Sequence, residues 1–292
     1  MKAAFLPDRG VVKVSGEDAR NFLNGLVTTD VTQLNPGQGR FGALLTPQGK
    51  IIVDFLITQA KSDGGGFLVD CPRPLSQALA DKLSFYKLRA KVTVENLSDS
   101  LGVIAAWDGD FTRQPDLAFA DPRDPALGFR ILSPEDLARK VAELIGADLV
   151  DSAAYEAHRI ACGAPRGGMD FIYGDAFPHE TNMDRFNGVD FEKGCYVGQE
   201  VVSRMQHRGT ARTRTVRIIL EGPSPEVGAT ILAGDKAVGT IGSTSGEKGL
   251  ALVRTDRVAD ALAVGAPLTA GGLPLHLAEP QAVLSANKPS PA

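Results

Sequence analysis

TVRIILEG (215–222), ATILAGDKAVGTIGST (229–244), GLALVR (249–254) and PLTAGGLPLHL (267–277) decide the fold class of this chain. Short apolar runs alternate here with turns that contain glycine, and such runs at regular spacing indicate antiparallel strands. Several short, evenly spaced strands are typical of a small barrel. We therefore predict a C-terminal antiparallel β-barrel over residues 211–284, a domain boundary near residue 210 and a disordered tail over 285–292.

Helical and strand patterns are mixed in residues 1–210, which predicts an α+β region. The stretch RFGALLTPQGKIIVDFLIT (40–58) has two apolar runs around a Pro–Gly turn and predicts a hairpin. Ser15 with Asp18 three places on resembles a capping box and predicts the start of a helix. The Asp-, Pro- and Gly-rich residues 108–128 predict connecting loops. Further strands are predicted at 11–14 and 91–95, and further helices at 75–89, 133–146 and 152–163.

The bulk composition is that of a globular protein. The chain has 292 residues, 43% hydrophobic and 23% charged, with a net charge of −4, so it does not have the charge of a protein that coats nucleic acid. Its cysteines are Cys71, Cys162 and Cys195, an odd number without zinc spacing, which predicts neither a disulfide framework nor a metal site. The chain shows no signal-peptide pattern and no apolar run long enough to span a membrane, so we predict a cytoplasmic location.

The most distinctive short stretch is EKGCYVGQE, residues 192–200. Gly194 and Gly198 flank Cys195 and allow tight backbone geometry or close approach of a ligand. The ammonium of Lys193 favours the thiolate, which is the reactive form of cysteine. The segment thus predicts a functional sulfur, although a lone cysteine is also often an inert, buried hydrophobe.

A local basic strip, RMQHRGTARTRTVR, occupies residues 204–217. One interpretation is a solvated strand face. The other is attraction for anions, either the glutamate tail of a folate or RNA phosphates, because arginine pairs well with both. No aromatic residues are interleaved with the arginines, which argues against direct binding of single-stranded nucleic acid.

Five blocks of the sequence carry a resemblance to a known family. They are KGCYVGQE (193–200), GEDARNFLNGLVTTDV (16–31), HRIACGAPRGGMDF (158–171) and PHETNMD (178–184), with GATILAGDKAVGTIGST (228–244) in the C-terminal region. Together they resemble the YgfZ family of folate-binding proteins, which act in the maturation of iron–sulfur proteins. That family is related to the aminomethyltransferase (T-protein) of the glycine cleavage system.

The resemblance implies a fold, a ligand and a set of site residues. The implied fold is a ring of two intertwined α+β lobes and a small barrel around a central folate cavity. The implied ligand is tetrahydrofolate or a one-carbon derivative, and the implied partners are iron–sulfur proteins or their assembly machinery. The implied catalytic residues are Cys195 and Lys193, within a motif that includes Gly194, Tyr196, Gly198, Gln199 and Glu200. The candidate folate contacts are Asp54, Arg159, Glu180, Asn182, Glu200 and Arg204.

Two positions depart from the T-protein pattern. T-proteins carry a catalytic aspartate at the position that matches Val53, followed by a second aspartate that matches Asp54, and valine cannot accept a proton. Asp54 either faces the cavity or solvates one face of a strand. T-proteins place a pterin-binding glutamate at the position of Ala161, so Glu180 and Glu200 become the available pterin anchors.

Three functions follow as hypotheses. The first is a folate-dependent accessory factor for the assembly or repair of iron–sulfur clusters, which supports enzymes such as tRNA methylthiolases through the Cys195 thiolate. The second is an aminomethyltransferase or another folate-dependent one-carbon transferase, against which Val53 counts. The third is a binding module without catalysis, which a buried and unreactive Cys195 would favour.

Overall fold

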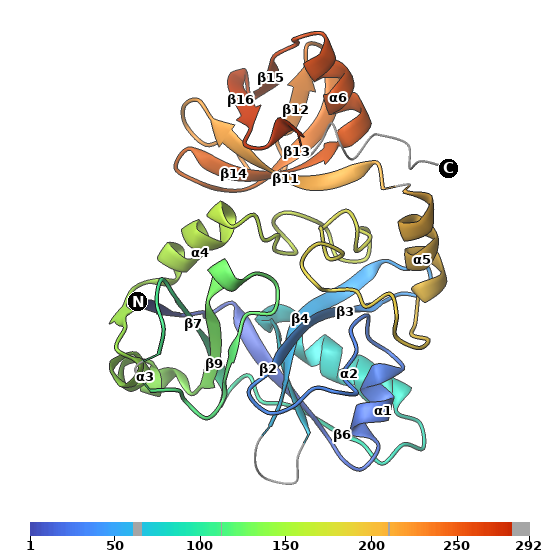
Figure 1. The fold of residues 1–292 in the computed structure, drawn as a ribbon, viewed down its shortest axis with the longest axis vertical. Helices are drawn as coiled ribbons and strands as arrows, with labels where there is room; N and C mark the ends of the chain where they lie inside the picture. Colours follow the sequence, from blue (N-terminus) through green and yellow to red (C-terminus); the bar gives the residue numbers. More distant parts are fainter. Residues whose placement is uncertain (61–65, 112, 210, 282–292) are drawn as a thin grey trace. The chain divides into compact units, whose positions relative to one another are not determined.

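The computed structural model describes residues 1–60, 66–111, 113–209 and 211–281 (Figure 1). By compactness the chain forms two units. The first comprises Met1–Tyr155 and Asp184–Gln199, and the second comprises Glu156–Met183 and the residues from Glu200 onward. The predicted tail over 285–292 and residue 210 at the predicted boundary lie outside the described residues, so both stay predictions.

The first unit contains a five-stranded sheet that begins with the predicted hairpin. Its strands in spatial order are β3 (Gly39–Leu45), β4 (Ile51–Gln59), β5 (Phe67–Pro72), β2 (Arg9–Ser15) and β6 (Thr93–Asn96). The short helix α1 (Ala19–Asn24) and helix α2 (Ser76–Tyr86) contribute Leu23, Leu79 and Leu83 to the core that this sheet buries (Figure 1). β3 is an edge strand of this sheet, and the chain that follows α1 pairs with it, because the N–H of Thr28 donates to the carbonyl of Ala43 at 3.1 Å.

A second five-stranded sheet completes the first unit. Its strands in spatial order are β10 (Asp148–Leu149), β1 (Lys2–Phe5), β7 (Gly102–Trp107), β9 (Phe129–Ser133) and β8 (Ala118–Ala120). Helix α3 (Ala138–Ile145) packs Ala142 and Ile145 into a core formed with Ile104 and Ile131. Helix α4 (Ser152–Ala161) begins in this unit and ends in the second.

The second unit contains the predicted barrel. Its strands close in the order β11 (Thr213–Leu220), β14 (Lys248–Arg254), β13 (Lys236–Ser245), β12 (Thr230–Ala233), β15 (Leu268–Ala270) and β16 (Leu273–Leu277) (Figure 1). Alternate residues such as Ile218, Ile231 and Leu275 fill the interior, together with Val258 of helix α6 (Thr255–Ala263). Helix α5 (Gln199–Arg208) precedes the barrel in the sequence. The predicted α+β fold with a C-terminal antiparallel barrel is confirmed.

Three local predictions need correction. The predicted capping box is wrong, because Ser15 ends β2 and α1 begins only at Ala19. Asp18 does not cap that helix with its side chain, and its Oδ2 instead accepts a hydrogen bond of 2.7 Å from the N–H of Lys91. Residues 108–128 are not all loop, since β8 pairs there with β9. Part of the basic strip is helix α5 and not a strand face, because its first residues continue a helix that begins at Gln199.

Candidate functional site

Cys195 differs from the other two cysteines in its exposure. All three are free thiols, and Cys195 is exposed while Cys71 is buried in the sheet core. Burial raises the pKa of the Cys71 thiol to about 12, so Cys71 stays protonated at neutral pH. Cys162 is half-buried directly after α4, with its Sγ 3.6 Å from Nε2 of His158. The interpretation of Cys195 as a buried hydrophobe is therefore excluded, whereas its functional role stays a prediction.

The segment before Cys195 is fastened to the residues that follow helix α1. The hydroxyl of Thr28 donates to the carbonyl of Gly188 at 2.6 Å, and the N–H of Asp190 donates back to the carbonyl of Thr28 at 2.9 Å. Asp190 then uses Oδ1 to accept the N–H groups of Glu192 and Lys193, at 2.9 and 3.0 Å. Two consecutive N–H groups on one carboxylate close a tight turn, which brings the chain to Cys195.

Lys193 lies within this turn and points toward the first unit. Its Nζ donates to the carbonyls of Asn24, Val27 and Thr29 at 2.8, 2.7 and 2.8 Å. Burial lowers the pKa of Lys193 to about 8, although the charges of Asp30 and Asp190 oppose the shift. At pH 7 the side chain is therefore still mainly an ammonium, with three N–H donors available for the three carbonyls.

Tyr196 and Gly198 fasten the segment on the other side of Cys195. Tyr196 is buried, and the Lys193 ammonium lies 5.3 Å from the centre of its ring. Burial, together with the charge of Asp190, raises the pKa of the Tyr196 phenol to about 12, so it stays protonated. Gly198 has a φ of +83° and packs on the β3–β4 turn, where an added Cβ would lie 2.6 Å from the carbonyl oxygen of Thr46. Cys195 is thus an exposed sulfur between two fixed points.

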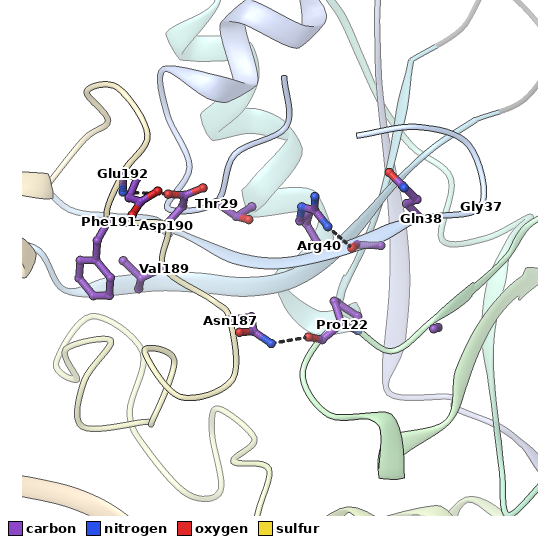
Figure 2. A pocket seen from close by; sticks show the side chains of 12 residues that line it. Thr29, Gly37, Gln38, Arg40, Pro122, Asn187, Val189, Asp190, Phe191 and Glu192 are labelled. Carbon is purple, nitrogen blue, oxygen red and sulfur yellow. Dashed lines mark hydrogen bonds between the residues drawn. The ribbon is translucent and has the colours of Figure 1, made fainter. Parts of the chain in front are cut away.

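A pocket of about 700 Å³ lies beside this segment (Figure 2). Its lining includes Thr29, residues 37–40 at the start of β3, Pro122 and residues 189–192. The guanidinium of Arg40 lies in the pocket, while Asp190 and Glu192 come from the cysteine segment (Figure 2). A volume of this size is typical of small-molecule sites. The sequence did not point to this pocket, because its lining joins segments about 150 residues apart.

Asp54 belongs to a buried charge network of the first unit. It is 7% exposed on β4, on the opposite face from Val53, which lies in the sheet core. Burial alone would lower the pKa of Arg9, but the charges of Asp70 and Asp54 hold this pKa above its usual value. The charge of Asp54 also raises the pKa of Arg123, although Asp121 raises it more. Its carboxylate therefore compensates buried guanidiniums, and its predicted contact with folate stays a prediction.

Arg159 in the second unit has a structural set of partners. Its Nε and Nη2 donate to the carboxylate of Glu156 at 2.8 and 2.6 Å, and Nη2 also donates to the hydroxyl of Ser243 at 2.8 Å. Its Nη1 donates to Asp170 at 3.0 Å and to the carbonyl of Ala164. A guanidinium has five N–H groups, and within the described residues all five are used. The predicted folate contact of Arg159 has no donor left to support it.

Glu180 and Asn182 lie in the segment that meets the start of β11. Glu180 accepts the N–H of Phe177 on Oε2 at 2.8 Å, and its carbonyl accepts the N–H of Thr215 at 2.8 Å. Asn182 has a φ of +58° and donates from Nδ2 to the carbonyl of Thr215 at 2.7 Å. Its Oδ1 is buried, and no described residue donates a hydrogen bond to it. Asn182 is therefore the predicted folate contact that retains a buried acceptor.

The remaining predicted residues lie on or next to α5. Glu200 and Arg204 are exposed and pair at 2.5 Å one turn apart, which is a surface ion pair of small energetic value. Arg208 and Arg212 of the basic strip are exposed as well. Arg214 and Arg217 donate to the carbonyls of His179 and Ala161, at 2.7 and 2.9 Å. Part of the basic strip thus holds the second unit together, and the pterin anchor at Glu200 stays a prediction.

These exposures predict the order in which the cysteines react. At pH 7 we expect iodoacetamide to alkylate the exposed Cys195 about tenfold or more faster than Cys71, because Cys71 is buried and its raised pKa keeps it protonated. Cys162 should react at an intermediate rate. Peptide mass spectrometry over a time course measures the three rates, and a sample in denaturant serves as the control in which the difference disappears. Equal rates for Cys71 and Cys195 in the native protein would contradict this assignment.

No helix among the described residues has the length and apolarity needed to cross a bilayer. The compartment in which the protein works stays a prediction.

Comparison with known proteins places the two ends of the chain in described domain families. Residues 8–107 match the GCVT N-terminal domain, and residues 212–284 match the C-terminal β-barrel domain of CAF17. The crystal structure of the glycine cleavage system aminomethyltransferase T from Bartonella henselae is similar with a TM-score of 0.72 and 18% identity. That similarity covers 94% of this chain and 84% of the other, and it shows a shared fold.

Several relatives carry the name of iron–sulfur cluster assembly factor IBA57, mitochondrial, or of its homologue. The protein from Mycosarcoma maydis is 37% identical over 74% of this chain, which spans only 56% of that relative. The protein from Pyricularia oryzae is 33% identical, with 91% of this chain and 75% of the relative covered. The protein from Mus musculus is 32% identical, with 87% and 77% covered. The chain belongs to the IBA57 family of iron–sulfur cluster assembly factors, and the predicted resemblance is confirmed.

Proposed function

We propose that this protein is an accessory factor in the assembly of iron–sulfur clusters and that the Cys195 thiol is its working group. The observation that carries the proposal is the exposed sulfur of Cys195, fastened on both sides by Lys193 and Gly198, in a chain of this family. Thiolates are the usual protein ligands of cluster iron. When the thiol loses its proton to solvent, its sulfur can bind the iron of a cluster that is passed on as substrate.

The proposed partners are proteins of the iron–sulfur assembly machinery, and the proposed clients are cluster enzymes such as tRNA methylthiolases. The proposal is tested in a strain that lacks its own member of the family. Expression of this chain should restore cluster-enzyme activity and the methylthiolation of tRNA. If neither recovers while the protein is present and folded, the proposed function is wrong.

Reduced folate is the proposed ligand. The match of residues 8–107 to the GCVT N-terminal domain supports it. Two positions fit this ligand less well. Position 161 is alanine and offers no carboxylate, and the predicted contact Arg159 has its donors occupied. Folate, when bound, would either supply one-carbon chemistry or stabilise the folded protein. The residues of this chain would bind and orient it.

Calorimetry tests the folate proposal directly. Titration of the full chain with tetrahydrofolate under anaerobic conditions should show saturable binding. Titration with p-aminobenzoylglutamate, which lacks the pterin, should give weaker binding, because this fragment has neither the N–H groups nor the ring area of the pterin. The absence of heat from tetrahydrofolate, confirmed by equilibrium dialysis, would remove folate from the proposal and leave the role of Cys195 standing.

An aminomethyltransferase function is not favoured by the site. Val53 is 1% exposed and lies within the core of the first sheet, so this position presents no carboxylate to a ligand. The charge of the neighbouring Asp54 raises the pKa values of the buried Arg9 and Arg123, so this carboxylate serves as a counter-charge to guanidiniums. A purely structural binding module is not favoured either, since Cys195 is exposed.

A further inference from the structure

The ammonium of Lys193 has all of its donors committed. A lysine side chain carries three N–H groups, and the carbonyls of Asn24, Val27 and Thr29 accept one each at 2.7–2.8 Å. These carbonyls belong to the end of α1 and to the turn that follows it. Carbonyls at a helix C-terminus lack partners within the helix, and a cation that caps them is favourable. Within the described residues Lys193 therefore has no N–H left to donate to the sulfur of Cys195.

We propose that Lys193 is a positioning residue, which fastens the Cys195 segment to the turn after α1 and acts on the sulfur through the position of the backbone. This inference rests on the proposed role of Cys195. It replaces the simpler idea, suggested by the adjacent KGC residues, that the lysine charge stabilises the thiolate directly. The two ideas differ in what they require of the side chain, because a charge effect needs only a cation whereas fastening needs three converging donors.

Other bonds of the same segment support the positioning role. The carbonyls of Val27 and Thr29 accept hydrogen bonds from the Lys193 ammonium. Thr28, which lies between them, is hydrogen-bonded to Gly188 and Asp190. The Lys193 main-chain N–H is held by Asp190 Oδ1 at 3.0 Å. Lys193, two residues before Cys195, thus links its own turn to the turn that follows α1.

Arginine and methionine at position 193 separate the two ideas. Arginine keeps the positive charge, but its planar guanidinium cannot direct three donors toward three carbonyls that surround one point. Methionine keeps much of the apolar stem and removes the charge. Fastening predicts that Lys193→Arg and Lys193→Met behave alike, and direct charge stabilisation predicts that Lys193→Arg restores what Lys193→Met loses. Lys91→Met is the matched control, since Lys91 lies in the same unit and bonds Glu17 on the surface at 2.7 Å.

The experiment measures local order and thiol ionisation on the same full-length proteins. In Lys193→Met and in Lys193→Arg we expect amide hydrogen exchange in residues 188–196 to accelerate about tenfold or more, with no change in Lys91→Met. The midpoint of the pH profile for Cys195 alkylation should stay within about 0.3 pH unit of the wild type in all variants. In the strain that lacks its own family member, both position-193 variants should restore less cluster-enzyme activity than the wild type, and Lys91→Met should restore as much.

Two results would overturn the positioning role. One is a midpoint that rises by about one pH unit in Lys193→Met and returns in Lys193→Arg, which would show direct stabilisation of the thiolate. The other is unchanged amide exchange in both variants. These results are independent of the proposed function, which fails instead if Cys195 itself proves dispensable.

A measurement on the wild type keeps the proposal testable if the variants do not fold. With ¹⁵N-labelled lysine, an ammonium held by three carbonyls should give an NH₃⁺ signal with slow hydrogen exchange at pH 6, unlike exposed lysines. If the protein shows no slowly exchanging lysine ammonium, the proposed fastening is absent.

Discussion

Replacement of Asp121 by asparagine is expected to lower the free energy of unfolding by about 3–5 kcal/mol, because it leaves buried guanidiniums without their counter-charge. Asp121 accepts two hydrogen bonds from the Arg123 guanidinium, at 2.9 and 2.7 Å, one from the Arg123 main-chain N–H at 3.1 Å and one from Arg130 at 3.3 Å. Its side chain is fully buried, and those of Arg123 and Arg130 are 9% and 4% exposed. Chemical denaturation of Asp121→Asn at pH 7 measures the loss.

The chain contains a matched control for this substitution. Asp256 holds Arg254 with the same two-point geometry, at 3.0 and 2.6 Å and also two residues apart, but this pair lies at the surface. Asp256→Asn should therefore leave the unfolding transition almost unchanged. If Asp121→Asn and Asp256→Asn had the same effect, the buried network would not contribute to stability as described.

The same network predicts a dependence on acid. Although burial alone would raise it, the charge of Arg123 and its hydrogen bonds hold the pKa of Asp121 at about 2, below its usual 3.8. The folded pKa is depressed, so this stabilisation is fully present above about pH 4 and is lost as the pH falls toward 2. The difference in unfolding free energy between the wild type and Asp121→Asn should shrink over that interval.

Gly198→Ala is expected to disrupt the Cys195 segment, whereas Gly194→Ala should leave the fold intact. At Gly198 the φ of +83° alone disfavours a side chain by about 1–3 kcal/mol, and the added Cβ would also lie 2.6 Å from the Thr46 carbonyl oxygen. At Gly194 the backbone has no positive φ, and an added Cβ would meet no atom within 4 Å. Thermal unfolding and amide exchange of residues 190–200 distinguish the two variants.

The comparison of the two glycines also separates folding from function. Because Gly194 is exposed and the fold does not require glycine there, a loss of cluster-enzyme activity in a stable Gly194→Ala protein would indicate close approach of a partner or ligand at that position. A Gly198→Ala protein with wild-type stability would contradict the packing of the motif on the β3–β4 turn.

The sequence predicted the elements that local patterns determine. Alternating apolar residues with glycine turns specify the barrel strands, and the Pro–Gly turn at 47–49 specifies the β3–β4 hairpin. The capping box predicted from Ser15 and Asp18 does not form, because the Asp18 side chain bonds the N–H of Lys91, 73 residues away. Such a partner leaves no local signal in the sequence.

The candidate site was only partly predictable for the same reason. The exposed sulfur of Cys195 follows from its glycines and charges, and the structure bears out this exposure. The carbonyls that hold Lys193 lie more than 160 residues earlier, so adjacency to Cys195 suggested a charge effect in place of a fastening. Arg159 was expected to contact a ligand because of the family resemblance. Two of the residues that occupy its donors, Asp170 and Ser243, lie 11 and 84 residues further along the chain and reach it only in the folded protein.

The central claim, that the Cys195 sulfur is the working group of this assembly factor, is tested most directly by Cys195→Ser in a strain without its own family member. At equal protein levels, Cys195→Ser should leave tRNA methylthiolation at the level of the empty strain, while Cys162→Ser should restore it as the wild type does. Full restoration by Cys195→Ser would contradict the claim.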